Sequence, residues 1–220
     1  MKNPIVFYKA QLKKHQEDVK SVKKKLIQLS LLRLLVFCVT AVSIYITFPE
    51  VQIAVVIGIV GLSLFLFLLK KYSKAKGKKV LLEALILINK EELQIASGDF
   101  YDREAGLEFQ DPKHFYSLDI DLFGKGSFYQ FINRTSVNKG SEKLAVILTE
   151  NSIDSISLKQ EALKELASIA KWRQNFAAIA NLVIIETPAK TIISWLQKYT
   201  VTLPKIMKWL PLFFSIISGL

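Results

Sequence analysis

The sequence predicts a mainly α-helical protein that begins with a transmembrane helical hairpin at residues 31–70. Hydrophobic residues make up 51% of the 220 positions, and most of the excess lies in two uncharged runs, residues 34–49 and 51–69. A helix needs about 20 apolar residues to cross the hydrocarbon core of a bilayer. The second run approaches this length. The first run reaches it when residues 26–32 are included and the Arg33 side chain extends toward the headgroups.

The two apolar runs are separated by Thr47-Phe48-Pro49-Glu50. Proline lacks the amide that a continuing helix would use, and it disfavours helical geometry in the preceding residue, so this tetrapeptide predicts a tight turn. The alternative is a signal peptide. It is the weaker interpretation because a second apolar run follows at once and no small-x-small cleavage site precedes it.

The flanks of the hairpin predict two basic helices, at residues 1–30 and 71–96. In the first, Leu12, Val19, Val22 and Leu26 form a partial apolar stripe, which favours an extension of the first membrane helix. A solvated charged helix in front of the anchor is the open alternative. In the second, a helix is favoured over a strand at residues 85–89, because Leu82, Leu85 and Asn89, together with Glu83 and Glu91, fit a helical period better than a period of two.

Lysines predict the orientation of the hairpin. Residues 1–30 hold eight lysines, and residues 70–79 hold six lysines and no acidic residue. Because lysine-rich flanks stay in the cytoplasm, both outer ends of the hairpin are expected there. Each lysine near the surface also favours anionic headgroups by about 1 kcal/mol. The lipid bilayer is therefore the expected partner of this part of the chain.

A net charge of +11 also suggests nucleic-acid binding, because phosphate neutralisation drives such binding. The first 79 residues, however, carry +12 and the remainder −1. The positive charge thus lies where lipid headgroups would meet it. Direct DNA contact by this chain is not expected.

The most informative segment is LDIDLFGKGSFYQFINRTSVNKGSEKL, residues 118–144, continued by LKQEALKELA at 158–167 and WRQNFAA at 172–178. This pattern resembles the core, or lever, domain of the MutS family of DNA mismatch-repair ATPases, and within it a membrane-associated bacterial branch. The resemblance covers roughly residues 111–180, with Ile120 and Lys159 departing from the usual residues. The matching positions are Asp119, Asp121, Phe123, Gly124, Gly126, Ser127, Asn133, Arg134, Thr135, Gly140, Gln160, Glu161, Leu166, Trp172, Arg173 and Phe176.

The resemblance implies a MutS core-like helical domain at residues 97–203, a bacterial inner-membrane location, and coupling to an ATPase domain that binds ATP and Mg²⁺. A phosphate-binding G-x-x-x-x-G-K-[ST] loop does not occur in this sequence, so this chain alone is not expected to be an ATPase or to hold a cofactor. Gly124-Lys125-Gly126-Ser127 is better interpreted as a glycine turn in which Ser127 caps the next helix. The family reads mismatches with Phe-x-Glu, and the only such triplet, Phe48-Pro49-Glu50, lies in the membrane turn.

Other chemistry has little support in the sequence. Cys38 lies inside the first apolar run and is expected to be structural. His15 and His114 lack partners at zinc-ligand spacing. Asp119 and Asp121 would share one side of an extended strand and could contribute to a Mg²⁺ site, together with Asp99, Asp102 and Asp111. Neighbouring glycines and Pro112 favour loop aspartates bonded to backbone amides instead.

In the core-like region the sequence predicts a loop or short strands at 97–117, helix starts at Ser127, Ser141 and Ser152, and a helix from Thr187-Pro188 through Tyr199. In the long helix that starts at Ser152, one stripe predicts a buried face: Leu166, Ile169, Trp172, Phe176, Ile179 and Val183. The residues expected to face solvent are Glu161, Lys164, Glu165 and Lys171.

Residues 204–220 resemble the start of a further transmembrane segment, because lysines and Trp209 precede an uncharged run. We therefore expect the chain to be the N-terminal part of a longer MutS-like protein, with any dimer formed through the remainder and any DNA contact made by the full-length protein. A tail anchor or a buried hydrophobic helix is the alternative for this segment. For function, the alternative is a non-enzymatic membrane scaffold that retains the core fold.

Overall fold

The structure is a computed structural model that describes residues 3–183 and 189–198. The described residues form helices and turns and contain no strand, in agreement with the predicted mainly α class. The chain divides into two compact units, Met1–Val183 and Ile184–Leu220, and each is considered by itself.

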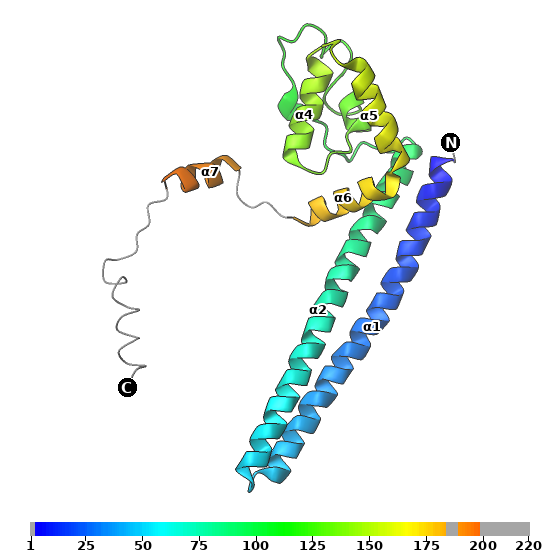
Figure 1. Ribbon diagram of the computed structural model, residues 1–220. Coiled ribbons are helices and arrows are strands. Elements are labelled where there is room, and N and C mark those ends of the chain that lie inside the picture. The colour runs from blue at the N-terminus through cyan, green and yellow to red at the C-terminus, as the bar shows by residue number, and fades with distance from the viewer. Residues whose placement is uncertain (1–2, 184–188, 199–220) are drawn as a thin grey trace. The chain divides into compact units, whose positions relative to one another are not determined.

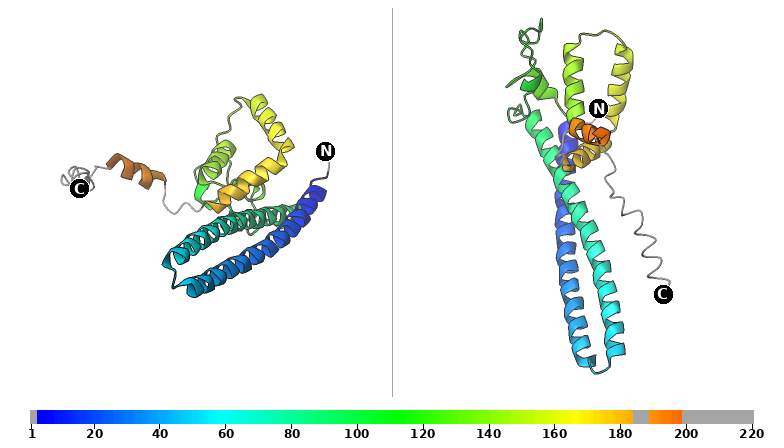
Figure 2. Two further views of the ribbon diagram at one scale, coloured as in Figure 1. Left: turned by 60° about the horizontal axis from the view of Figure 1, so that its bottom comes forward. Right: turned by 90° about the vertical axis from the view of Figure 1, so that its left-hand side faces the viewer.

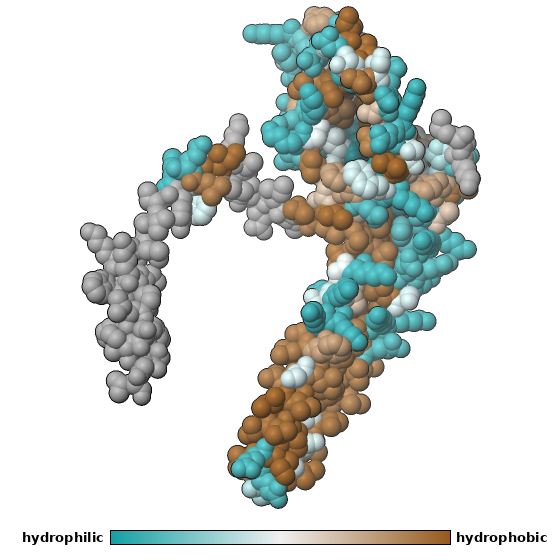
Figure 3. Space-filling view, in the orientation of Figure 1, coloured by the Kyte–Doolittle hydropathy of each residue, from teal (hydrophilic) through white to brown (hydrophobic). Residues whose placement is uncertain are grey.

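Two long helices, α1 (Pro4–Thr47) and α2 (Val51–Ala96), lie side by side as an antiparallel hairpin (Figures 1 and 2). The turn between them occupies residues 48–50, the last three of the predicted tetrapeptide. Both basic flanks continue the apolar helices without a break, so residues 71–96 are the end of α2 and not a separate helix. Both helices are long and apolar enough to cross a membrane. Figure 3 shows the apolar side chains in a continuous band near the turn, with polar side chains beyond it.

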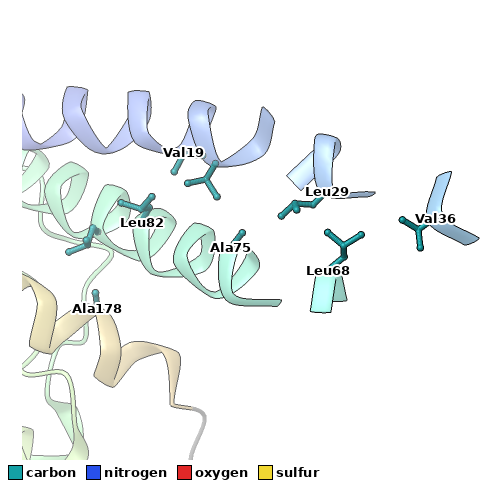
Figure 4. Packing of buried hydrophobic residues seen from close by; sticks show 9 residues of the cluster. Val19, Leu29, Val36, Leu68, Ala75, Leu82 and Ala178 are labelled. Atoms are coloured by element: carbon teal, nitrogen blue, oxygen red, sulfur yellow. The ribbon is translucent and has the colours of Figure 1, made fainter. Parts of the chain in front are cut away.

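The hairpin is held together by small and aliphatic side chains at its interface. Val19, Leu29 and Val36 of α1 lie against α2, where Leu68, Ala75 and Leu82 are also buried (Figure 4). The stripe predicted in residues 1–30 therefore packs against α2. Within the apolar band the helices approach closely at Gly61, where an added Cβ would lie 2.3 Å from Thr40 Oγ1.

Arg33 marks the polar end of the apolar band. Its guanidinium lies 4.3 Å from the ring centroid of Tyr72 on the neighbouring helix. Tyr72 belongs to the lysine-rich segment that starts at Lys70, so the charged residues of both helices begin at the same level. Arg33 thus makes a cation–π contact with the second helix at the level of its lysine-rich segment.

After α2 the chain forms a compact head segment, which we define as residues 97–150. It contains the 3₁₀ turn η1 (Leu107–Phe109) and the helices α3 (Phe128–Ile132) and α4 (Asn138–Thr149). Its core contains Leu122, Phe123, Tyr129 and Ala145. Ser127 starts α3 as predicted. The prediction for Ser141 is wrong, because α4 begins three residues earlier, at Asn138.

The long helix predicted from Ser152 is two helices, α5 (Ile156–Ser168) and α6 (Ala170–Leu182). The break lies at Ile169, whose φ of −103° and ψ of 44° are not helical. The helical start is also later than predicted, because Ser155 has a left-handed φ of 57° and α5 begins after it.

The prediction of a buried stripe is wrong as well. All six of its members are exposed, Trp172 at 56% and Phe176 at 52%, and α5 has no buried residue. The residues that α6 buries are Gln174 and Ala178, on the side that meets α2. The face of α6 that packs against α2 is thus the one with small and amide side chains. The four charged residues expected in solvent are exposed.

The second unit contains α7 (Ala189–Lys198). This helix falls inside the predicted one, whereas the expected cap at Thr187-Pro188 and the segment 204–220 lie outside the described residues.

Candidate functional site

The glycine-rich motif forms the turn that starts α3. Gly124 and Gly126 have φ values of 111° and 80°, which glycine adopts without a steric cost. Ser127 Oγ accepts a hydrogen bond from the Gln130 amide at 3.1 Å, as expected for a helix cap. The Gly126 amide donates to Gln130 Oε1 at 2.7 Å. This amide is therefore bonded within the turn and does not point toward a phosphate position.

Gln130 organises this region, although the sequence pattern does not single it out. Its side chain is 1% exposed. Besides accepting from Gly126, it donates from Nε2 to the carbonyl oxygens of Tyr101 and Arg103, at 3.0 and 2.6 Å. One amide group thus joins the loop after α2 to the first turn of α3. No local sequence signal identifies it, because its acceptors lie nearly thirty residues away.

The Asn-Arg-Thr motif ends α3 with a tight local network. Asn133 Oδ1 accepts from the Thr135 amide at 2.9 Å and from Thr135 Oγ1 at 2.7 Å. Thr135 Oγ1 lies 2.7 Å from Ser141 Oγ of α4. A Cβ at Gly140 would lie 3.3 Å from Thr135 Cβ, so a larger residue there would require Thr135 to shift by a few tenths of an ångström. These motif positions therefore fix the connection from α3 to α4.

Two arginines join the head segment to the end of α2. Arg134 Nε lies 2.8 Å from Glu92 Oε1, and Arg103 Nη1 lies 3.3 Å from Glu91 Oε2. Arg103 Nη2 also donates to the carbonyl oxygen of Asn133. We call these five residues the hairpin–head junction. Arg103 was not among the residues that the sequence motif indicates, since both Arg103 and its partner Glu91 precede the motif.

A second connection to α2 is made by α6, in a different way. Gln174 Nε2 donates to Asn89 Oδ1 at 2.9 Å, and Asn89 Nδ2 donates to the Leu85 carbonyl at 2.7 Å. Asn89 is fully buried, and Gln174 is 7% exposed. Ala178, also fully buried, belongs to the same apolar cluster as Leu85. This contact is therefore buried, whereas the ion pairs of the hairpin–head junction are partly exposed.

A groove of about 430 Å³ lies where these connections meet. The stacked rings of Trp172 and Phe176, 5.7 Å apart, form part of its wall. Tyr8 of α1 also lines the groove, and burial raises the pKa of its hydroxyl. Seven of the sixteen motif residues line the groove, namely Arg134, Thr135, Gly140, Leu166, Trp172, Arg173 and Phe176. Just under half of the motif residues thus gather around this groove.

The other motif residues lie elsewhere. Asp119 and Asp121 are in consecutive turns and not in a strand, and Asp121 has a φ of 46°. Phe123 belongs to the core of the head segment. Gln160 and Glu161 are exposed on α5. The hypothetical Mg²⁺ site lacks the strand geometry on which it depended.

Metal chemistry has no structural support in the described part of the chain, where no group of three or more His, Cys, Asp or Glu side chains is arranged to hold an ion. A second cavity of about 440 Å³ is lined by Glu91, Asp99, Asp102 and Glu104, but these carboxylates do not form such a group. His114 serves the fold, with its Nε2 3.1 Å from the Thr149 carbonyl and its Nδ1 accepting from the Ser117 amide. Cys38 is exposed on the apolar part of α1.

Comparisons with family models, with curated proteins and with solved structures find no match to this chain. The described site is therefore interpreted from its own geometry, as the region in which α2, the head segment and α6 meet.

Proposed function

We propose that this chain is the membrane-anchored N-terminal part of a MutS-like protein and acts as its lever, coupling a membrane hairpin to an ATPase domain. The observation that carries the proposal is the continuity of α2. It runs unbroken from the apolar band to Glu91 and Glu92, where Arg103 and the motif residue Arg134 bind it. A helix of 46 residues spans about 70 Å, so it can carry a displacement over that length.

The two kinds of contact on α2 suggest which parts move together. The ion pairs of the hairpin–head junction are partly exposed, and such pairs contribute about 0–1 kcal/mol each. Their arginines can therefore exchange partners at low cost when the head segment turns. The buried Asn89–Gln174 contact is costly to open, because an unpaired amide would remain in a dry site. In the proposed lever α6 moves with α2, while the head segment pivots at the junction.

The setting follows from the sequence resemblance and the lysine distribution. Both soluble parts lie in the cytoplasm at the bacterial inner membrane. The ATPase domain carries the phosphate-binding loop and binds ATP and Mg²⁺. Any contact with DNA is made by the full-length protein. Mismatched duplex is not expected to bind the 220-residue chain alone.

The test isolates the native product from source-cell membranes with an antibody against residues 119–178, then labels it with a photoreactive ATP analogue. The expected result is a labelled product well above 25.0 kDa. A product of 25.0 kDa would contradict the lever proposal and leave the scaffold interpretation. In parallel, the purified 220-residue chain should bind neither ATP nor mismatched duplex, and specific binding of either would overturn this assignment of domains.

A further inference from the structure

We propose that α7 is an interfacial helix that binds an anionic lipid surface, giving the chain a membrane contact separate from the hairpin. The proposal concerns the second unit and does not depend on the lever. It rests on three properties of α7: the arrangement of its apolar positions, its charge, and its length.

The apolar positions of α7 fall on one side of the helix. Positions 192, 193 and 196 lie within an arc of about 100°, and Trp195 adjoins that arc. Ile193, Trp195 and Leu196 are 52–60% exposed. The opposite side carries Ser194, Gln197 and Lys198. This division is typical of helices that lie in the plane of a membrane interface, where tryptophan is also favoured.

The charge of this segment selects an anionic partner. Residues 184–220 contain four lysines and one acidic residue, Glu186, and two of the lysines, Lys190 and Lys198, belong to α7. The exposed apolar face of α5 differs, because Lys159 and Lys164 alternate there with Glu161 and Glu165. Unlike α5, α7 thus combines an apolar face with positive charge alone. Anionic headgroups meet both requirements at once.

The ten residues described for α7 extend about 15 Å, half of the roughly 30 Å hydrocarbon thickness, which suits a position in the plane of the interface. The hairpin of the same chain supplies the other attachment, and tethering to a bilayer raises the effective concentration of lipid around α7. A short helix that would bind weakly by itself is thereby expected to be bound in the anchored chain.

The experiment follows Trp195 fluorescence in the full chain carrying Trp172→Phe and Trp209→Phe, reconstituted into vesicles with brominated lipids. We expect stronger quenching by bromine near the headgroups than by bromine at the bilayer centre, in vesicles rich in phosphatidylserine. Replacing Lys190→Gln and Lys198→Gln should lower the ratio of bound to free α7 roughly 30-fold, as the loss of two surface lysines predicts.

The matched control is Lys159→Gln with Lys164→Gln, which removes the same charge from exposed positions of α5. This variant should leave Trp195 quenching unchanged. Three results would overturn the proposal. The first is no quenching of Trp195 by lipid, as for a helix in water or covered by protein. Quenching strongest at the bilayer centre would indicate a spanning helix. Equal quenching in uncharged phosphatidylcholine vesicles would remove the role of the lysines.

Discussion

Removing one side of the Asn89–Gln174 hydrogen bond should loosen α6 from α2, and removing both sides should largely restore the contact. Gln174→Leu takes away the donor that lies 2.9 Å from Asn89 Oδ1. Asn89 is fully buried, so its oxygen has no access to water in exchange. Asn89→Leu leaves the complementary defect at Gln174, whose 7% exposure gives its amide some access to solvent.

The expected magnitudes follow from the cost of an unsatisfied buried polar group, about 1–3 kcal/mol. Gln174→Leu should therefore raise the opening equilibrium of α6 about 5- to 150-fold, and Asn89→Leu should lie toward the lower end of that range. The double variant replaces both amides by apolar groups of similar size and should lie close to wild type. The two substitutions are thus expected to be strongly non-additive.

The assay is hydrogen exchange of the α6 amides in the full chain, held in detergent or nanodiscs, because local opening is reported segment by segment. Asn175→Leu is the matched control, since Asn175 adjoins Gln174 and is exposed. It should leave α6 protection unchanged. Single variants that exchange like wild type, or a double variant whose loss equals the sum of the singles, would refute the argument that this hydrogen bond joins the two helices.

Three further predictions concern the rest of the first unit. Gly61→Ala should lower thermal stability in detergent by about 1–3 kcal/mol through overpacking against Thr40, while Gly58→Ala, whose Cβ would lie 3.7 Å from its nearest neighbour, should have little effect; equal losses would contradict this. Ser127→Ala should cost about 1 kcal/mol as a lost cap, measured by denaturant unfolding, and an unchanged midpoint would count against the cap. Burial lowers the pKa of His15 below its ordinary 6.5, so the stability that the neutral side chain contributes is complete above that pH and is lost as the pH falls through the folded value. Between about pH 8 and about pH 5, the free energy of unfolding of wild type should therefore fall more than that of His15→Gln. Parallel pH curves for the two proteins would exclude this role.

The hairpin could be predicted from the sequence because its determinants are local. Uncharged runs, a proline turn and lysine-rich flanks each act within a few residues, and the spacing of Leu82, Leu85 and Asn89 predicted the helix in which α2 ends. The serine cap of α3 is also determined by nearby residues. The contacts of the hairpin–head junction are determined by residues distant in sequence. Arg103 and Gln130 act on partners 12 to 30 residues away, and no periodicity marks such a distance.

The stripe on α5 and α6 shows a limit of periodicity as evidence. Spacing of three and four identifies an apolar face, but it does not tell which face meets a neighbour. In α6 the neighbour is α2, and close approach requires the small side chain of Ala178 rather than Trp172 or Phe176. The break at Ile169 has no sequence signal of its own, since neither proline nor glycine is present there.

Asn89 nevertheless carried a signal about α6 that periodicity alone misses. An asparagine that continues a stripe of buried leucines requires a hydrogen-bond partner, because its amide cannot be left unpaired in an apolar contact. Its Nδ2 is satisfied locally by the Leu85 carbonyl, but its Oδ1 needs a donor from elsewhere. Gln174 lies with Ala178 on the face of α6 that has small and amide side chains, and it supplies that donor across 85 positions. The need of Asn89 for a distant donor would thus have favoured this face of α6 over the apolar stripe, and with it the element expected to move with the hairpin.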